Sequence, residues 1–317
     1  MSRTPNITTY YRPEQVLSEE AAKQNYSKSP IKPKILIDTL KAEGLDQYLS
    51  LNSTFTPLAK EDFRQAHTAE YVDAFFKGDK KLCETSGLTW SDDLKMSVSY
   101  TNASLVHSVM HALDNPREVV FSPTSGFHHA KPGQGAGFCT FSGQVIASLK
   151  AFQERGAKGA YLDLDAHYGN SIEDSRAFVP ELNEAVPRGL NINPEGKHEE
   201  YIANCKAHLK RLEPLVLGYE IDYLVFCHGA DSHQADDLEG GQCTTEEWLE
   251  CSKIFYQWVN KMDQLRGDPI PLVLSLFGGY RHDDYGSVIS LHIADLVECL
   301  NTLCGRDVKY DLKVKEN

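Results

Sequence analysis

The sequence has no CxxC pair, although eight cysteines are scattered through its 317 residues. Scattered cysteines in a chain of this length argue against a disulfide framework and against a structural zinc knuckle. No apolar run reaches the roughly 18 residues that a membrane-spanning helix needs. Residues 1–11 are polar and lack the apolar core of a signal peptide. We therefore expect a reduced, cytoplasmic protein with no membrane partner.

Positive charge is also in short supply. The chain carries 32 lysines and arginines against 45 acidic residues, a formal net charge of −13. A surface that binds nucleic acid is normally basic, so we expect no nucleic-acid partner. A negative field attracts cations such as lysine-rich peptides or polyamines, although the charge can equally serve solubility alone.

The chain shows no internal repeat, low-complexity tract or long Gly/Ser linker, which favours a single domain over residues 1–317. Short apolar runs alternate with glycine-containing loops and helix-period segments, a pattern typical of an α/β protein with a mostly parallel central sheet flanked by helices. Four strands are predicted at 118–122, 159–164, 221–227 and 270–277. The helix after the first strand should stop at Gly156, and the helix after the third should open with a Thr244–Glu247 capping box. Residues 62–76 and 97–113 predict supporting helices in the N-terminal third.

Each predicted strand ends in polar residues beside glycine. Ligands bind at the carboxyl ends of strands in open parallel sheets, so these loops should converge. Asp163, Asp165 and His167 alternate and should face the same side. With Asp231 from the third loop, Asp165 and His167 would supply three ligands and leave one position open, as in a catalytic zinc site. Taken singly, such residues are more often capping or hydrogen-bonding groups.

Two further loops supply groups with acid–base or hydrogen-bonding chemistry. The adjacent pair His128 and His129 follows the first strand, and a neutral imidazole there could move a proton between water and a leaving amine. Asp163 and Asn170 are candidate partners that would fix the tautomers of the two rings. Tyr280 follows two glycines and could donate a hydrogen bond to an oxyanion. The bland alternatives are exposed loop histidines and a simple turn.

Gly137 and Phe138 could line a tunnel for an extended apolar chain. From the residues alone, packing of Phe138 in the core is slightly favoured.

Five ordered segments resemble the histone deacetylase superfamily, which includes acetylpolyamine amidohydrolases. They are AHTAEYV (66–72), SPTSGFHHAKPGQGAGFCTF (122–141), YLDLDAHYGNS (161–171), FCHGADSHQADDLEGG (226–241) and LFGGY (276–280). The resemblance extends from about residue 56 to near the end of the chain. It implies an arginase/deacetylase-type fold with one catalytic Zn²⁺.

The resemblance also implies roles for individual residues. Asp165, His167 and Asp231 match the zinc ligands, and Tyr280 matches the carbonyl-polarising tyrosine. His129 matches the base and His128 its electrostatic partner, while Asp163 and Asn170 match the polar partners of the two histidines. Gly137 and Phe138 match the tunnel segment. A structural K⁺ beside the zinc is a further implication, with oxygens around Asp163, Asp165 and His167.

Three features depart from the family pattern. Tyr168 replaces a histidine that is not a ligand, Glu239 stands where glycine is common, and residues 29–36 differ from the usual Pro- and Arg-rich entry. These departures put the shape of the rim and the acyl and carrier preference in doubt. A binuclear arginase-type site is poorly provided for, because Gly169 and His233 stand where carboxylates would be needed.

Together these features predict a zinc-dependent amidohydrolase that removes an acyl group, acetyl in the first instance, from the side-chain amine of lysine in proteins or peptides. One alternative is an acetylpolyamine amidohydrolase. Another is a non-catalytic acyl-lysine binding protein, which the intact set of site residues argues against. The sequence leaves the oligomeric state and the physiological substrate open.

Overall fold

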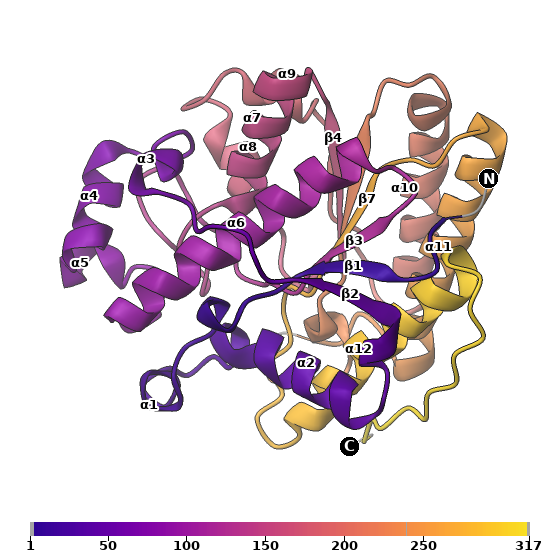
Figure 1. Ribbon diagram of the computed structural model, residues 1–317, viewed down its shortest axis with the longest axis horizontal. Helices are drawn as coiled ribbons and strands as arrows, with labels where there is room; N and C mark the ends of the chain where they lie inside the picture. The colour runs from indigo at the N-terminus through magenta and orange to yellow at the C-terminus, as the bar shows by residue number, and fades with distance from the viewer. Residues whose placement is uncertain (1–2, 239, 316–317) are drawn as a thin grey trace.

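The computed structural model describes residues 3–238 and 240–315. At its centre lies a seven-stranded sheet in which all neighbouring strands run parallel (Figure 1). In spatial order the strands are β2 (Leu49–Asn52), β1 (Ile7–Tyr10), β3 (Val119–Ser122), β7 (Leu272–Ser275), β6 (Tyr223–Cys227), β4 (Gly159–Asp163) and β5 (Asn191–Ile192). The five residues of β4 and of β6 and the four of β3 and of β7 are all buried, as expected where helices cover both faces of a parallel sheet.

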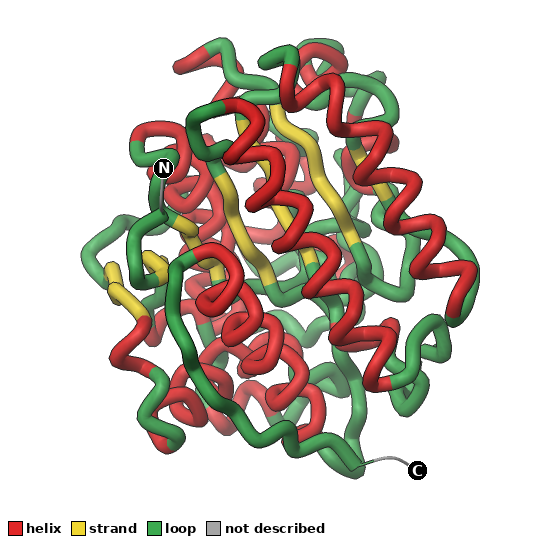
Figure 2. The backbone as a smooth tube through the Cα atoms, turned by 90° about the vertical axis from the view of Figure 1, so that its right-hand side faces the viewer, coloured by secondary structure: helices red, strands yellow, loops and turns green. Residues whose placement is uncertain are grey.

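Helices cover the sheet on both faces. The face on the left in Figure 1 carries α6 (Asp92–Asp114) and α7 (Gly143–Arg155), which pack together. The other face, turned toward the viewer in Figure 2, carries α2 (Lys32–Ala42), α10 (Glu199–Leu217), α11 (Thr245–Arg266) and α12 (Tyr285–Leu303). Shorter helices are α1 (Glu19–Ala22), α3 (Lys60–Phe63), α4 (Ala69–Lys77), α5 (Lys80–Cys83), α8 (Ser171–Ser175) and α9 (Leu182–Ala185). Within the described ranges, no helix is both long and apolar enough to cross a membrane.

The predicted α/β fold class is confirmed, and the four predicted strands correspond to β3, β4, β6 and β7. The boundaries are off by one or two residues. The prediction of 270–277 is too long at its end because Phe277 has a positive φ of 56°, which turns the chain out of the sheet. The predicted helix signals hold: Gly156 ends α7 in a left-handed conformation, and Thr244 and Glu247 form a capping box on α11.

The N-terminal third differs from the prediction of supporting helices alone, because it also supplies β1 and β2. The predicted helix over 62–76 is wrong as one element, since it is split into α3 and α4. Thr68 caps α4 by accepting a hydrogen bond from the Tyr71 amide, and its own N–H donates to the carbonyl of Pro132. The helix predicted at 97–113 begins five residues earlier, where Ser91 caps α6.

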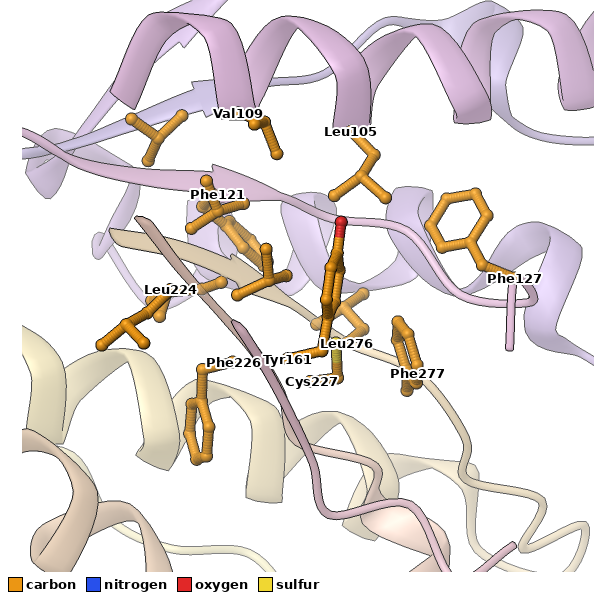
Figure 3. Close-up of a cluster of buried hydrophobic side chains, with 14 of the residues drawn as sticks. Leu105, Val109, Phe121, Phe127, Tyr161, Leu224, Phe226, Cys227, Leu276 and Phe277 are labelled. Carbon is orange, nitrogen blue, oxygen red and sulfur yellow. The ribbon is translucent and has the colours of Figure 1, made fainter. Parts of the chain in front are cut away.

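The hydrophobic core between α6 and the sheet extends up to the carboxyl end of the strands. Figure 3 shows Leu105 and Val109 of α6 above Phe121 and Tyr161 of the sheet. At its edge, the rings of Phe127 and Phe277 lie 6.2 Å apart. These two residues directly precede loops that carry polar residues, so a close-packed apolar floor lies beneath those loops.

Candidate metal centre and active site

The candidate site lies where four neighbouring strands end. The strands β3, β7, β6 and β4 are consecutive in the sheet, so the loops that follow them share one edge. These loops carry His128 and His129, Tyr280, Asp231, and the Asp165–His167 pair, respectively. Four stretches of chain that are distant in sequence therefore meet, as strand-end loops of a parallel sheet do.

The three side chains predicted to bind a metal form one compact group. One ligand atom each from Asp165, His167 and Asp231 lies within 4.8 Å of the others. The His167 Nδ1 lies 3.0 Å from Asp165 Oδ1 and 3.0 Å from Asp231 Oδ2. Asp231 is 0% and Asp165 5% exposed, so two carboxylates are buried side by side with one imidazole.

The surroundings of this group suit a small dication. Burial and the neighbouring Asp165 raise the pKa of Asp231, because two buried carboxylates repel each other. The Oδ1 atom of Asp231 is buried and has no hydrogen-bond partner among the described residues. Gly229 and Gly278 pack closely against the carboxylates: a Cβ at Gly278 would overlap both, and a Cβ at Gly229 would overlap that of Asp231. Two carboxylates and one histidine form a donor set that zinc accepts.

The two histidines are each oriented by a polar partner. The Nδ1 of His128 lies 2.8 Å from Asp163 Oδ2, and the Nδ1 of His129 lies 2.8 Å from Asn170 Oδ1. Since both partner oxygens accept, each Nδ1 carries the proton and each Nε2 is left for the site. The two rings lie 4.1 Å apart, and His129 lies 6.0 Å from the ring of His167.

The environment separates the pKa values of the two histidines. Burial alone would lower the pKa of His128, but the carboxylates of Asp165 and Asp163 outweigh it and raise the value to about 9. Burial and the adjacent His128 lower the pKa of His129 to about 4. At neutral pH His128 is therefore cationic and His129 is a neutral ring able to accept a proton.

Tyr280 lies close to the ring of His167. Its ring centroid is 6.3 Å from that of His167 and 5.6 Å from that of Phe138. Burial, followed by Asp165 and Asp231, raises the pKa of Tyr280, so the phenol keeps its proton and can donate a hydrogen bond. Phe138 is half-buried: it packs on the core, as the residues alone favoured, yet also faces Tyr280. Gly137, with φ 48°, packs against the ring of His129, where a Cβ would overlap it.

Two residues that sequence reasoning missed make hydrogen bonds to residues 277–280, the tyrosine segment. Lys32 is 0% exposed, and its ammonium donates to the backbone carbonyls of Phe277 and Gly278, the latter at 2.7 Å. The carboxylate of Asp236 accepts from the backbone N–H of Tyr280 at 2.7 Å. Lys32 lies within the atypical entry at 29–36, but a buried lysine has no local signal in a sequence.

Of the other residues noted in the sequence, Tyr168 is exposed, His233 is paired with another side chain, and Glu239 is not described. Tyr168 is 57% exposed. His233 pairs through Nε2 with Thr245 Oγ1 at 2.9 Å. Glu239, expected to reshape the rim, lies outside the described residues.

The sequence is similar to known proteins of the histone deacetylase type. A family model described as histone deacetylase domain matches residues 26–182. The chain is 23% identical over 191 residues to "Histone deacetylase 8" of Danio rerio, covering 57% of this chain and 49% of that protein. It is 25% identical over 148 residues to "Acetoin utilization protein AcuC" of Staphylococcus aureus, covering 39% and 38%. The alignments thus span half or less of these two relatives.

The fold matches that of a solved structure over nearly the whole chain. The "HDA15 HD domain" aligns with a TM-score of 0.71 and 18% identity, over 98% of this chain and 91% of that one. The fold is therefore that of the deacetylase-type α/β proteins. The family match, which starts before the expected residue 56 and stops before the Asp231 and Tyr280 segments, adds the family itself: the chain belongs to the histone deacetylase superfamily.

Proposed function

We propose that this protein is a zinc-dependent amidohydrolase that removes an acyl group from the side-chain amine of lysine. The observation that carries the proposal is the buried Asp165–His167–Asp231 group, flanked by two oriented histidines and a protonated phenol. Zinc, held by these three residues, would supply Lewis-acid chemistry by lowering the pKa of a water molecule and polarising a carbonyl. The additional K⁺ implied by the family resemblance stays a prediction.

The remaining groups would act on protons and charge. His129, neutral at Nε2, would accept a proton from the attacking water and later return it to the leaving amine. The cation of His128 would stabilise the negative charge that develops beside it, while Asp163 and Asn170 hold the two rings in orientation. Tyr280 would donate a hydrogen bond to the oxyanion. Gly137 and Phe138 would line the path of the acyl chain. The eight free cysteines suit a cytoplasmic setting.

The proposal is tested with zinc-loaded protein and a panel of acyl-lysine peptides of increasing acyl length. We expect amide hydrolysis that a chelator abolishes. Asp165→Ala should lose both zinc, measured by elemental analysis, and turnover. Asp307→Ala, which removes an 82% exposed carboxylate, is the control and should keep both. Full zinc occupancy in Asp165→Ala would contradict the ligand assignment.

An acetylated polyamine is a second candidate substrate, favoured by the net charge of −13. Comparing kcat/KM for an acetyl-lysine peptide with that for acetylputrescine separates the two. Bound zinc without turnover on either carrier, at any acyl length, would instead favour an acyl-lysine binding protein.

A further inference from the structure

The loop that follows Asp231 reaches across to the segment that carries Tyr280. In this loop the side chain of Asp236 uses both oxygens. Its Oδ2 accepts from the Tyr280 backbone N–H at 2.7 Å, and its Oδ1 accepts from the Leu238 backbone N–H at 2.9 Å. The backbone at Gly240 packs on the Cβ of Asp236, with no room for a side chain there. The carboxylate is thus held in one direction by its own turn.

The tyrosine segment depends on such outside contacts. Phe277 has φ 56° and Gly279 has φ 133°, conformations in which an L side chain is strained. Lys32 holds the carbonyls that precede Gly279, and Asp165 Oδ2 accepts from the Gly278 N–H at 2.9 Å. These contacts all lie on the side of the segment before Gly279. Asp236 supplies the contact at the backbone of Tyr280 itself.

We propose that Asp236 is a positioning residue that holds the backbone of Tyr280, and thereby its phenol, at the correct place beside the Asp165–His167–Asp231 group. The role of the phenol in turnover rests on the function proposed above. Because Asp236 lies in the same loop as Asp231, one segment sets both a metal ligand and the hydrogen-bond donor that faces it. Both carboxylate oxygens are needed, since each one accepts from a different backbone N–H.

Asp236→Asn is the sharpest variant, because it preserves the size of the side chain. Its amide offers one acceptor and one NH₂ group, so one of the two backbone donors loses its partner. Gln234→Ala is the matched control, since it alters an exposed side chain of the same loop.

The first measurement does not require turnover. Amide hydrogen exchange, resolved by residue, should speed up at Tyr280 or Leu238 in the Asp236→Asn protein and at both in Asp236→Ala, while the Gly278 amide keeps its protection. The Gln234→Ala protein should match the wild type. Unchanged exchange at Tyr280 in Asp236→Ala would overturn the proposal, whether or not the chain hydrolyses any amide.

The second measurement asks whether Asp236 acts through the phenol. With zinc content and KM unchanged, kcat of Asp236→Ala, which loses both hydrogen bonds, should fall about 10- to 100-fold, because a small misplacement of a reacting group is costly. In a Tyr280→Phe background the same change should matter less than about twofold. Independent, multiplicative losses would refute positioning through Tyr280. If wild-type protein hydrolyses no substrate, the proposed function fails, and the exchange experiment still decides the contact.

Discussion

At the scale of single residues, the site depends on the positions of the backbone nitrogen and the phenol oxygen of Tyr280. Its backbone N–H is held by Asp236 and its buried ring faces His167. The raised pKa keeps the phenol protonated, which is the state that donates. The chemistry asked of this residue is thus a single hydrogen bond to a negative oxygen.

Tyr280→Phe tests that hydrogen bond alone. Loss of one oxyanion donor typically costs about 10²- to 10³-fold in kcat, and we expect a loss on this scale. Steady-state kinetics on an acyl-lysine peptide measures it, with zinc content as the check that the metal group is intact. Undiminished kcat would remove Tyr280 from the proposed chemistry.

Gly278→Ala tests the close packing around the ligands. A Cβ at this position would overlap the carboxylates of both Asp231 and Asp165. We expect weaker zinc binding, measured by competition with a chromogenic chelator, with the overall fold kept. Gly133→Ala is the matched control, because it adds a methyl group in open space at a glycine that, like Gly278, has no positive φ. Equal zinc affinity in the two variants would contradict the inference that the close packing of Gly278 against the two carboxylates matters for zinc binding.

At the scale of elements, loops are tied together by buried polar side chains. His67, just before the cap of α4, donates from Nδ1 to the carbonyl of Lys131 at 2.9 Å. Its Nε2 accepts from the backbone N–H of Ser142, the cap of α7, at 2.9 Å. The bond at Nε2 requires a neutral ring, because a protonated Nε2 cannot accept a hydrogen bond. Burial lowers the pKa of His67 from 6.5 to about 4.

This shift predicts a loss of stability in acid. Between pH 6.5 and 4, His67 is protonated in the unfolded chain but stays neutral in the folded chain. The contribution is therefore fully present above pH 6.5 and is lost as the pH falls to about 4, by about 3 kcal/mol. Urea unfolding at pH 7 and pH 4.5 should show a smaller acid loss in His67→Gln than in wild type. An equal loss in both proteins would contradict the assignment, and the exposed His198→Gln is the control.

At the scale of the whole molecule, the proposed ion would join loops from two strands, β4 and β6. A ligand that binds only the folded state stabilises it by mass action, by about 2.7 kcal/mol when its free concentration is about 100 times Kd. We therefore expect a chelator to lower Tm in calorimetry. Asp165→Ala should show no such shift, and a Tm independent of zinc in the wild type would argue against a bound ion.

The amino-acid sequence determined the local features of this protein. Runs of apolar residues marked β3, β4, β6 and β7, because four or five consecutive buried positions leave a continuous hydrophobic signal. The helix ends at Thr244 and Gly156 were predictable, since capping depends on neighbouring residues only. The chemical types of Asp165, His167 and Asp231 were also evident, as was their place after strands.

Only the tertiary structure decided which strands lie side by side and which distant groups meet. The order β3-β7-β6-β4 is not written in the order of the chain. The short strands β1 and β2 gain their stability from neighbours. Lys32 can be buried only because a distant segment supplies carbonyl acceptors for its ammonium. Likewise, Asp236 can hold Tyr280 only because the fold brings the Tyr280 backbone N–H to its carboxylate. Long-range partners of this kind leave no local pattern, because the free energy that stabilises them comes from contacts across the fold.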